Sequence, residues 1–189
     1  SLAGLFGKEP QEFLFGSPFL YCMNAESVKF WKKRMCGMSL PYELCEREIR
    51  TLLNRIREDG IAGLEMPVYG HIPMMVTANC IVGSFDRNKC PNAQKQIWLK
   101  DRTGKRMYVK TECGYCLNTI YNSVPLSMHK HMPKLQKLYE NGLLSSFSLY
   151  FTMENAEQTK KVLDRYLYPD QGIWAPGSYT NGHFQRGVV

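Results

Sequence analysis

Cysteines are the residues of this 189-residue chain whose type and spacing point most directly to chemistry. Four of the seven lie close together in the sequence, at Cys80, Cys90, Cys113 and Cys116. Two residues separate the last pair, so the chain can fold back and bring both sulfurs to one metal ion or one cluster edge. Four thiolates suit either a tetrahedral zinc ion or an iron–sulfur cluster. The spacing alone leaves that choice open.

Other interpretations of the cysteines remain open. An odd number of cysteines argues against a simple disulfide framework. One alternative is a lone Cys-x-x-Cys pair beside two unrelated thiols. A cysteine nucleophile is weaker, because no spacing pairs a histidine with a thiol. Cys22, Cys36 and Cys45 are interpreted as small buried apolar residues.

The chain is basic, with a net charge of +7 and a pI of about 9.0. Positive residues gather between residues 87 and 110, where they form either a solvated surface or a surface for phosphate or an acidic partner. Six residues are candidate contacts to a substrate or nucleic acid: Arg87, Lys89, Arg102, Arg106, His183 and Arg186. Trp98, Tyr115 and Tyr121 are candidates for stacking on a base, with core packing as the alternative.

Strand-like and helix-like patterns alternate in the first eighty residues. Residues 19–24 have the length and composition of a strand, and residues 63–80 are typical of a strand, a turn and a second strand. Apolar spacing predicts helices over residues 25–35 and 46–57. This alternation predicts βα units around a parallel sheet. A closed eight-stranded barrel needs about 250 residues, so we expect an incomplete α/β scaffold.

The pattern changes between residues 80 and 127. Helical periodicity stops, and Asp101–Gly104 has the composition of a hairpin turn. A helix ending near Asn141, a strand over residues 147–151 and a helix capped by Asn155 follow. We therefore divide the chain into residues 1–79, 80–127 and 128–189, with the cysteine-bearing segment in the middle.

The sequence also bears on location. No apolar run approaches the roughly twenty residues that cross a bilayer, and no secretory signal is recognisable. We expect a cytoplasmic protein without a membrane partner. Ser1 opens the chain instead of Met, and the first residues carry no helix-start signal. We expect a missing N-terminal portion.

Several ordered blocks of sequence resemble one known family, the collagenase-like U-thirty-two peptidases. The blocks are LPYELCEREIRTLL (40–53), GHIPMMVTANC (70–80), LKDRTGKRMYV (99–109), YCLNTIYNS (115–123) and GHFQRGV (182–188). Within them, Cys80 and Cys116 match family cysteines best. The chain departs from the family pattern at His71 and Leu117, where arginine is common, and at Pro67, where phenylalanine is usual.

The resemblance implies a fold and a function. The fold is a partial TIM-type barrel holding only the later βα units, followed by a small α+β cysteine-bearing region. The function is that of an iron–sulfur protein acting in oxygen-independent hydroxylation of RNA or a small aromatic molecule. A [4Fe–4S] cluster is then held by Cys80, Cys90, Cys113 and Cys116, with zinc as the alternative.

Two other functions are possible. The family name implies a collagenase-like peptidase, which is a hydrolase. A non-catalytic fragment with a structural metal site is the third possibility. The implied partners are RNA and either the missing N-terminal part of the barrel or a homologous partner subunit.

Overall fold

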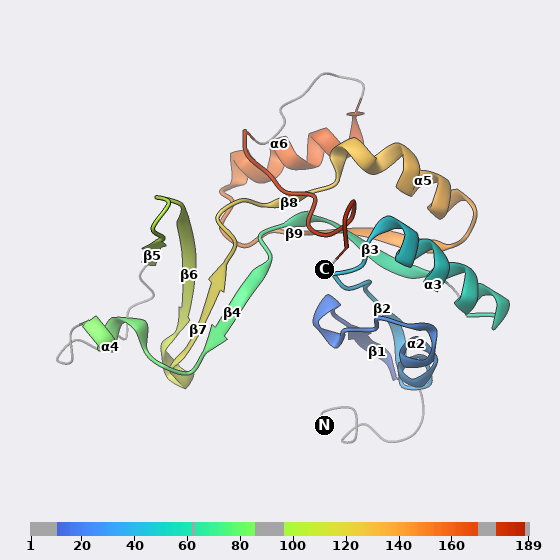
Figure 1. The fold of residues 1–189 in the computed structure, drawn as a ribbon, viewed down its shortest axis with the longest axis horizontal. Coiled ribbons are helices and arrows are strands. Elements are labelled where there is room, and N and C mark those ends of the chain that lie inside the picture. The colour runs from blue at the N-terminus through green and yellow to red at the C-terminus, as the bar shows by residue number, and fades with distance from the viewer. Residues whose placement is uncertain (1–10, 62, 86–96, 170–176, 188–189) are drawn as a thin grey trace.

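The computed structural model describes residues 11–61, 63–85, 97–169 and 177–187 and has an α/β fold (Figure 1). Its central feature is a series of four parallel strands, β1 (Gln11–Gly16), β2 (Met35–Met38), β3 (Leu64–Gly70) and β9 (Leu144–Tyr150). β1 pairs with β2, and β3 pairs with β9. A parallel bridge between Ser39 and Glu65 joins β2 to β3. Strands that follow one another in this series are therefore neighbours in space.

Helices connect these strands. α2 (Ala25–Lys32) lies between β1 and β2, and α3 (Glu46–Glu58) lies between β2 and β3. α5 (Met132–Glu140) precedes β9, and α6 (Ala156–Leu167) follows it. The predicted cap of α6 is confirmed, because Asn155 Oδ1 accepts from the Gln158 N–H at 2.9 Å and Gln158 Oε1 accepts from the Asn155 N–H at 2.9 Å.

The core lies between the helices and the parallel strands. α3 buries its predicted apolar stripe of Ile49, Leu52, Leu53 and Ile56. These side chains belong to one cluster with Val68 of β3 and with apolar residues of α5. Burial of this stripe is the main force that holds α3 against the sheet.

A second, antiparallel sheet extends away from the helices (Figure 1). Its strands are β4 (Pro73–Thr77), β5 (Ile97–Lys100), β6 (Arg106–Glu112) and β7 (Leu117–Tyr121), in the spatial order β4-β7-β6-β5. We call it the four-stranded sheet. The short helix α4 (Ile81–Phe85) follows β4. The predicted hairpin turn is confirmed, since the Asp101 carboxylate accepts from the Thr103 and Lys105 N–H groups.

Shorter elements complete the described residues. β8 (Leu126–Ser127) pairs antiparallel with β3. The 3₁₀ turns are η1 (Pro18–Leu20), η2 (Cys113–Tyr115) and η3 (His129–His131). β4 precedes the predicted boundary at residue 79 but belongs to the same sheet as β5, β6 and β7. The division into three segments otherwise stays a prediction.

Two local predictions are wrong. Residues 19–24 form no strand, because Pro18 starts a 3₁₀ turn and Tyr21 adopts the left-handed conformation with φ of 53°. The strand lies earlier, at β1. The helix predicted to reach Met35 ends at Lys32, because residues 35–38 pair with β1. Pairing between strands thus overrides the helical spacing of Met35.

The barrel expectation is met only at the level of fold class. The described strands form three separate sheets, and none of these sheets closes on itself. The α/β class is confirmed.

The Tyr166 hydroxyl group ties α6 to the three-stranded sheet β8-β3-β9. It donates to the Val68 carbonyl oxygen at 2.7 Å and accepts from the Met128 N–H at 3.0 Å. Tyr166→Phe removes both hydrogen bonds of the hydroxyl group, while the Met128 N–H still donates to the Val68 carbonyl oxygen at 2.9 Å. We therefore expect the free energy of unfolding to fall by about 0.5–1.5 kcal/mol. Urea denaturation measures it, with half-exposed Tyr168→Phe as the control. Equal losses in both variants would contradict the assignment.

The same hydroxyl group makes stability depend on alkaline pH. Burial raises the pKa of Tyr166 to about 12, from an ordinary value of 10.0. The folded state therefore holds this proton more tightly, and the stabilisation is complete below the ordinary pKa and is lost as pH rises towards the folded value. The stability difference between wild type and Tyr166→Phe should narrow as pH rises from about 10 to about 12. A constant difference would contradict this pH dependence.

Candidate metal centre and an adjoining pocket

Three of the four predicted metal ligands lie at one end of the four-stranded sheet. Cys80 follows β4, whereas Cys113 and Cys116 lie in the turn between β6 and β7. β4 and β7 are antiparallel and pair Thr77 with Asn118, so the residues after β4 lie beside those before β7. The buried Asn118 side chain strengthens this junction by donating to the Asn79 carbonyl oxygen at 2.7 Å. We call this region the cysteine end of the sheet.

The backbone at the cysteine end favours thiolate ligands. The Gly83 N–H donates to Cys80 Sγ at 3.3 Å, in the first turn of α4. Such N–H donors stabilise sulfur-borne negative charge around a metal. Cys116 adopts the left-handed conformation with φ of 50°, is exposed, and donates its N–H to the Cys113 carbonyl oxygen at 3.3 Å. This tight turn brings the backbones of the Cys-x-x-Cys pair together.

The fourth predicted ligand, Cys90, lies outside the described residues, as do Arg87 and Lys89. Within the part of the chain that the structure describes, no group of three or more histidine, cysteine, aspartate or glutamate side chains is placed to hold a metal ion. The donor set at the cysteine end nevertheless suits a zinc ion or an iron–sulfur cluster in kind, because its members are thiols on neighbouring segments.

The other three cysteines differ from one another. Cys22 is buried, as predicted, and burial raises its pKa. Cys36 is exposed, so its predicted burial is wrong; its place in β2 turns the side chain outward, where Sγ donates to the Leu14 carbonyl oxygen at 3.2 Å. Cys45 is half-buried just before α3.

The described basic candidates fall in two places away from the cysteine end of the four-stranded sheet. Arg102 is exposed in the β5–β6 turn, and the exposed Arg106 lies with Cζ 4.9 Å from the centre of the Trp98 ring. The whole length of β6 separates them from Cys113. His183 and Arg186 are also exposed, but in a segment held on α3, where the Phe184 carbonyl oxygen accepts from the Glu46 N–H at 2.8 Å.

A polar site that the sequence analysis missed lies at the opposite end of the four-stranded sheet. His71 directly follows β3, and Glu154 lies four residues beyond β9. Tyr69 donates its hydroxyl hydrogen to Glu154 Oε1 at 3.0 Å, and His71 Nε2 lies 3.8 Å from the same oxygen. The carboxyl ends of parallel strands are where α/β folds place ligands, and that position is the signal that could have found this site.

A second missed cluster joins the residue after β2 to β3 and β9. Glu65 of β3 accepts a hydrogen bond from Ser39 Oγ, and Tyr150 OH donates to the same Glu65 oxygen at 3.1 Å. Ser39 is buried. Burial is the main cause that raises the pKa of Tyr150, so this hydroxyl stays protonated beside the carboxylate.

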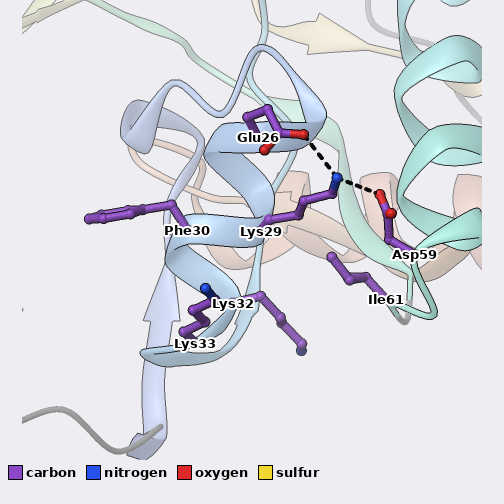
Figure 2. Close-up of a pocket in the computed structure, with 7 residues that line it drawn as sticks. All are labelled: Glu26, Lys29, Phe30, Lys32, Lys33, Asp59 and Ile61. Carbon is purple, nitrogen blue, oxygen red and sulfur yellow. Dashed lines mark hydrogen bonds and ion pairs between the residues drawn. The ribbon is translucent and has the colours of Figure 1, made fainter.

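The hollow of about 620 Å³ beside α2 holds a satisfied ion group (Figure 2). Lys29 Nζ lies 2.8 Å from both Glu26 Oε1 and Asp59 Oδ2, and these carboxylates raise the pKa of Lys29. Phe30 points away from the three charged groups in Figure 2. Lys32 and Lys33 also line the hollow. Because its acidic side chains are already paired with Lys29, the hollow is best explained as the surface between α2 and the end of α3.

Comparison of the chain with family models, with curated proteins and with solved structures found no match. No helix in the described ranges is long and apolar enough to cross a membrane.

Proposed function

We propose that the chain belongs to an iron–sulfur protein of the U-thirty-two peptidase kind, acting in oxygen-independent hydroxylation of RNA or a small aromatic molecule. The observation behind this proposal is that Cys80, Cys113 and Cys116 all lie at the cysteine end of the four-stranded sheet. Segments more than thirty residues apart in sequence meet there, which a lone Cys-x-x-Cys pair would not require.

The cluster is proposed as [4Fe–4S], with Cys90 as the fourth ligand. When bound, it supplies one-electron redox chemistry. The role of the chain is to hold the thiolates and to set the polarity around them. The Gly83 N–H that donates to Cys80 Sγ serves this role. Zinc remains the alternative occupant, since the same four thiolates would bind it.

The fold supports the proposed barrel origin. The parallel strands β1, β2, β3 and β9 follow one another in chain order, and helices alternate with them, as in an arc of a (βα) barrel. Among the described strands β1 pairs with β2 alone, and Phe15 of β1 and Phe19 just after it are exposed. An open strand edge with apolar side chains is suited to further strands. We propose that the rest of the barrel, or a homologous subunit, covers it.

A peptidase is the second candidate, and a histidine–serine contact is the feature that would favour it. His129 Nδ1 lies 2.9 Å from Ser127 Oγ, the distance expected of a nucleophile and its base. Both residues are buried, however, and Tyr166 also contacts Ser127 Oγ at 3.1 Å. A serine enclosed in this way cannot reach a peptide bond, so the contact is better explained as a core polar network.

Analysis of RNA from cells tests the hydroxylation proposal. Cells lacking the protein should lose a nucleoside that is heavier by one oxygen atom than its parent, as detected by mass spectrometry. The wild-type gene and Cys36→Ser should restore it, whereas Cys80→Ser should not, because Cys36 lies in β2 and Cys80 lies at the cysteine end. Full restoration by Cys80→Ser would contradict a role for the metal centre. An RNA nucleoside profile that does not change on deletion, together with unchanged hydroxylation of small aromatic metabolites, would contradict the reaction class.

A further inference from the structure

The pocket beside Glu154 combines a buried charge with an aromatic wall. It has a volume of about 350 Å³, within the range of small-ligand sites. Tyr69, His71 and Glu154 form its polar side. Trp98 and Tyr108, paired across β5 and β6 with ring centres 5.4 Å apart, form its aromatic side. The rest of the lining consists of Pro125, Met153, Gln158, Gly177 and Ser178.

Burial and backbone hydrogen bonds hold the Glu154 carboxylate in one position. Its side chain is only 5% exposed. Oε2 accepts from the Thr152 N–H at 2.8 Å and from the Met153 N–H at 3.1 Å, which fixes the carboxylate plane. Oε1 then points to Tyr69 and His71. Burial is the main cause that raises the pKa of Tyr69, and the nearby Glu154 carboxylate raises it further. The Tyr69 hydroxyl group therefore remains a hydrogen-bond donor.

The hydrogen bonds of His71 leave two acceptors facing each other. The Asn122 carbonyl oxygen can only accept, so His71 Nδ1, at 2.9 Å from it, carries the ring hydrogen. In the neutral imidazole, Nε2 is then a bare acceptor, and it lies 3.8 Å from the acceptor Glu154 Oε1. Two acceptors at this separation are complementary to a donor placed between them. His71 and Glu154 both line the pocket, so a ligand in the pocket lies against this pair.

We infer that this pocket binds a nucleobase that carries an exocyclic amino group, with the amino group donating to His71 Nε2 and Glu154 Oε1. The ring of the base lies against the aromatic wall of Trp98 and Tyr108, a contact that every planar base can make. The exposed Arg106, stacked over Trp98, is placed to meet a phosphate or ribose attached to that base. This inference deepens the RNA part of the proposed function and rests on it for its biological meaning.

Nuclear magnetic resonance titration of the wild-type chain with adenosine and cytidine tests the inference, following the indole N–H of Trp98. We expect both nucleosides to shift this signal. N6,N6-dimethyladenosine has the same purine ring without the amino hydrogens and should bind about 10-fold or more weakly. A short single-stranded RNA is titrated in the same way. We expect it to bind more tightly than the free nucleosides, because Arg106 can contact a phosphate group of the RNA and a nucleoside has none.

Glu154→Gln is the matched variant. The amide keeps an oxygen for the Thr152 and Met153 N–H groups and places its NH₂ group opposite His71, so one acceptor becomes a donor. We expect adenosine binding to weaken about 10-fold to 100-fold. Glu157→Gln, on the exposed face of α6, should bind as wild type does.

Equal binding of adenosine and its dimethyl derivative, or no loss in Glu154→Gln, would overturn the inference. So would the absence of any Trp98 shift at millimolar nucleoside. The metal content of the same preparations is measured in parallel. If the protein contains iron but does not bind nucleosides, the nucleobase site is contradicted and the proposed iron–sulfur centre is not. If the protein binds nucleosides but contains no iron, the iron–sulfur centre is contradicted and the nucleobase site is not.

Discussion

Leu53→Ala is expected to lower the free energy of unfolding by about 2–5 kcal/mol, the largest effect on stability that we predict. Leu53 is fully buried in α3 and belongs to the cluster that joins α3 to β3 and α5. Alanine removes apolar contacts and leaves a cavity that the close-packed surroundings fill only in part. Urea denaturation at neutral pH measures the change.

Leu167→Ala is the control for this experiment. Leu167 ends α6 and is 65% exposed, so its truncation should cost less than about 1 kcal/mol. Similar losses in the two variants would show that α3 is not held against the sheet by its apolar stripe.

Cys116→Ser is expected to give the largest effect on the metal centre, lowering the bound iron per chain by about tenfold or more. Cys116 already has a positive φ, and serine meets the same steric cost there, so the substitution removes the sulfur with little change in backbone strain. Iron and acid-labile sulfide, measured after purification without oxygen, report the loss.

Cys36→Ser is the matched control, because Cys36 is also exposed but lies in β2 instead of the four-stranded sheet. It should keep the full iron content. Equal iron in Cys116→Ser and wild type would remove Cys116 from the proposed ligands.

The sequence predicts most of the regular elements where local signals and burial agree. The stripe of α3 is buried as its spacing indicates, and the Asn155 cap and the Asp101 turn form through hydrogen bonds between near neighbours in sequence. Residues 19–24 differ from the prediction because Pro18 starts a 3₁₀ turn, and residues 35–38 differ because they pair with β1. Apolar spacing carries no information on such long-range pairing.

The candidate sites also depend on pairing between strands that are distant in sequence. Cysteine spacing alone suggested a shared site, and the antiparallel pairing of β4 with β7 gives Cys80 and Cys116 their common end of the sheet. Glu154 and His71 are 83 residues apart, and their contact depends on the parallel pairing of β3 with β9. No local motif marks such a contact, so the pocket was beyond the sequence analysis.

The most direct test of the central claim is the visible absorption spectrum of the wild-type chain, purified without oxygen and analysed for iron, sulfide and zinc. A [4Fe–4S] centre held by Cys80, Cys90, Cys113 and Cys116 predicts a brown protein with a broad absorption near about 400 nm and about four iron and four sulfide per chain. A colourless protein that contains no iron, or that contains zinc in its place, would contradict the iron–sulfur assignment.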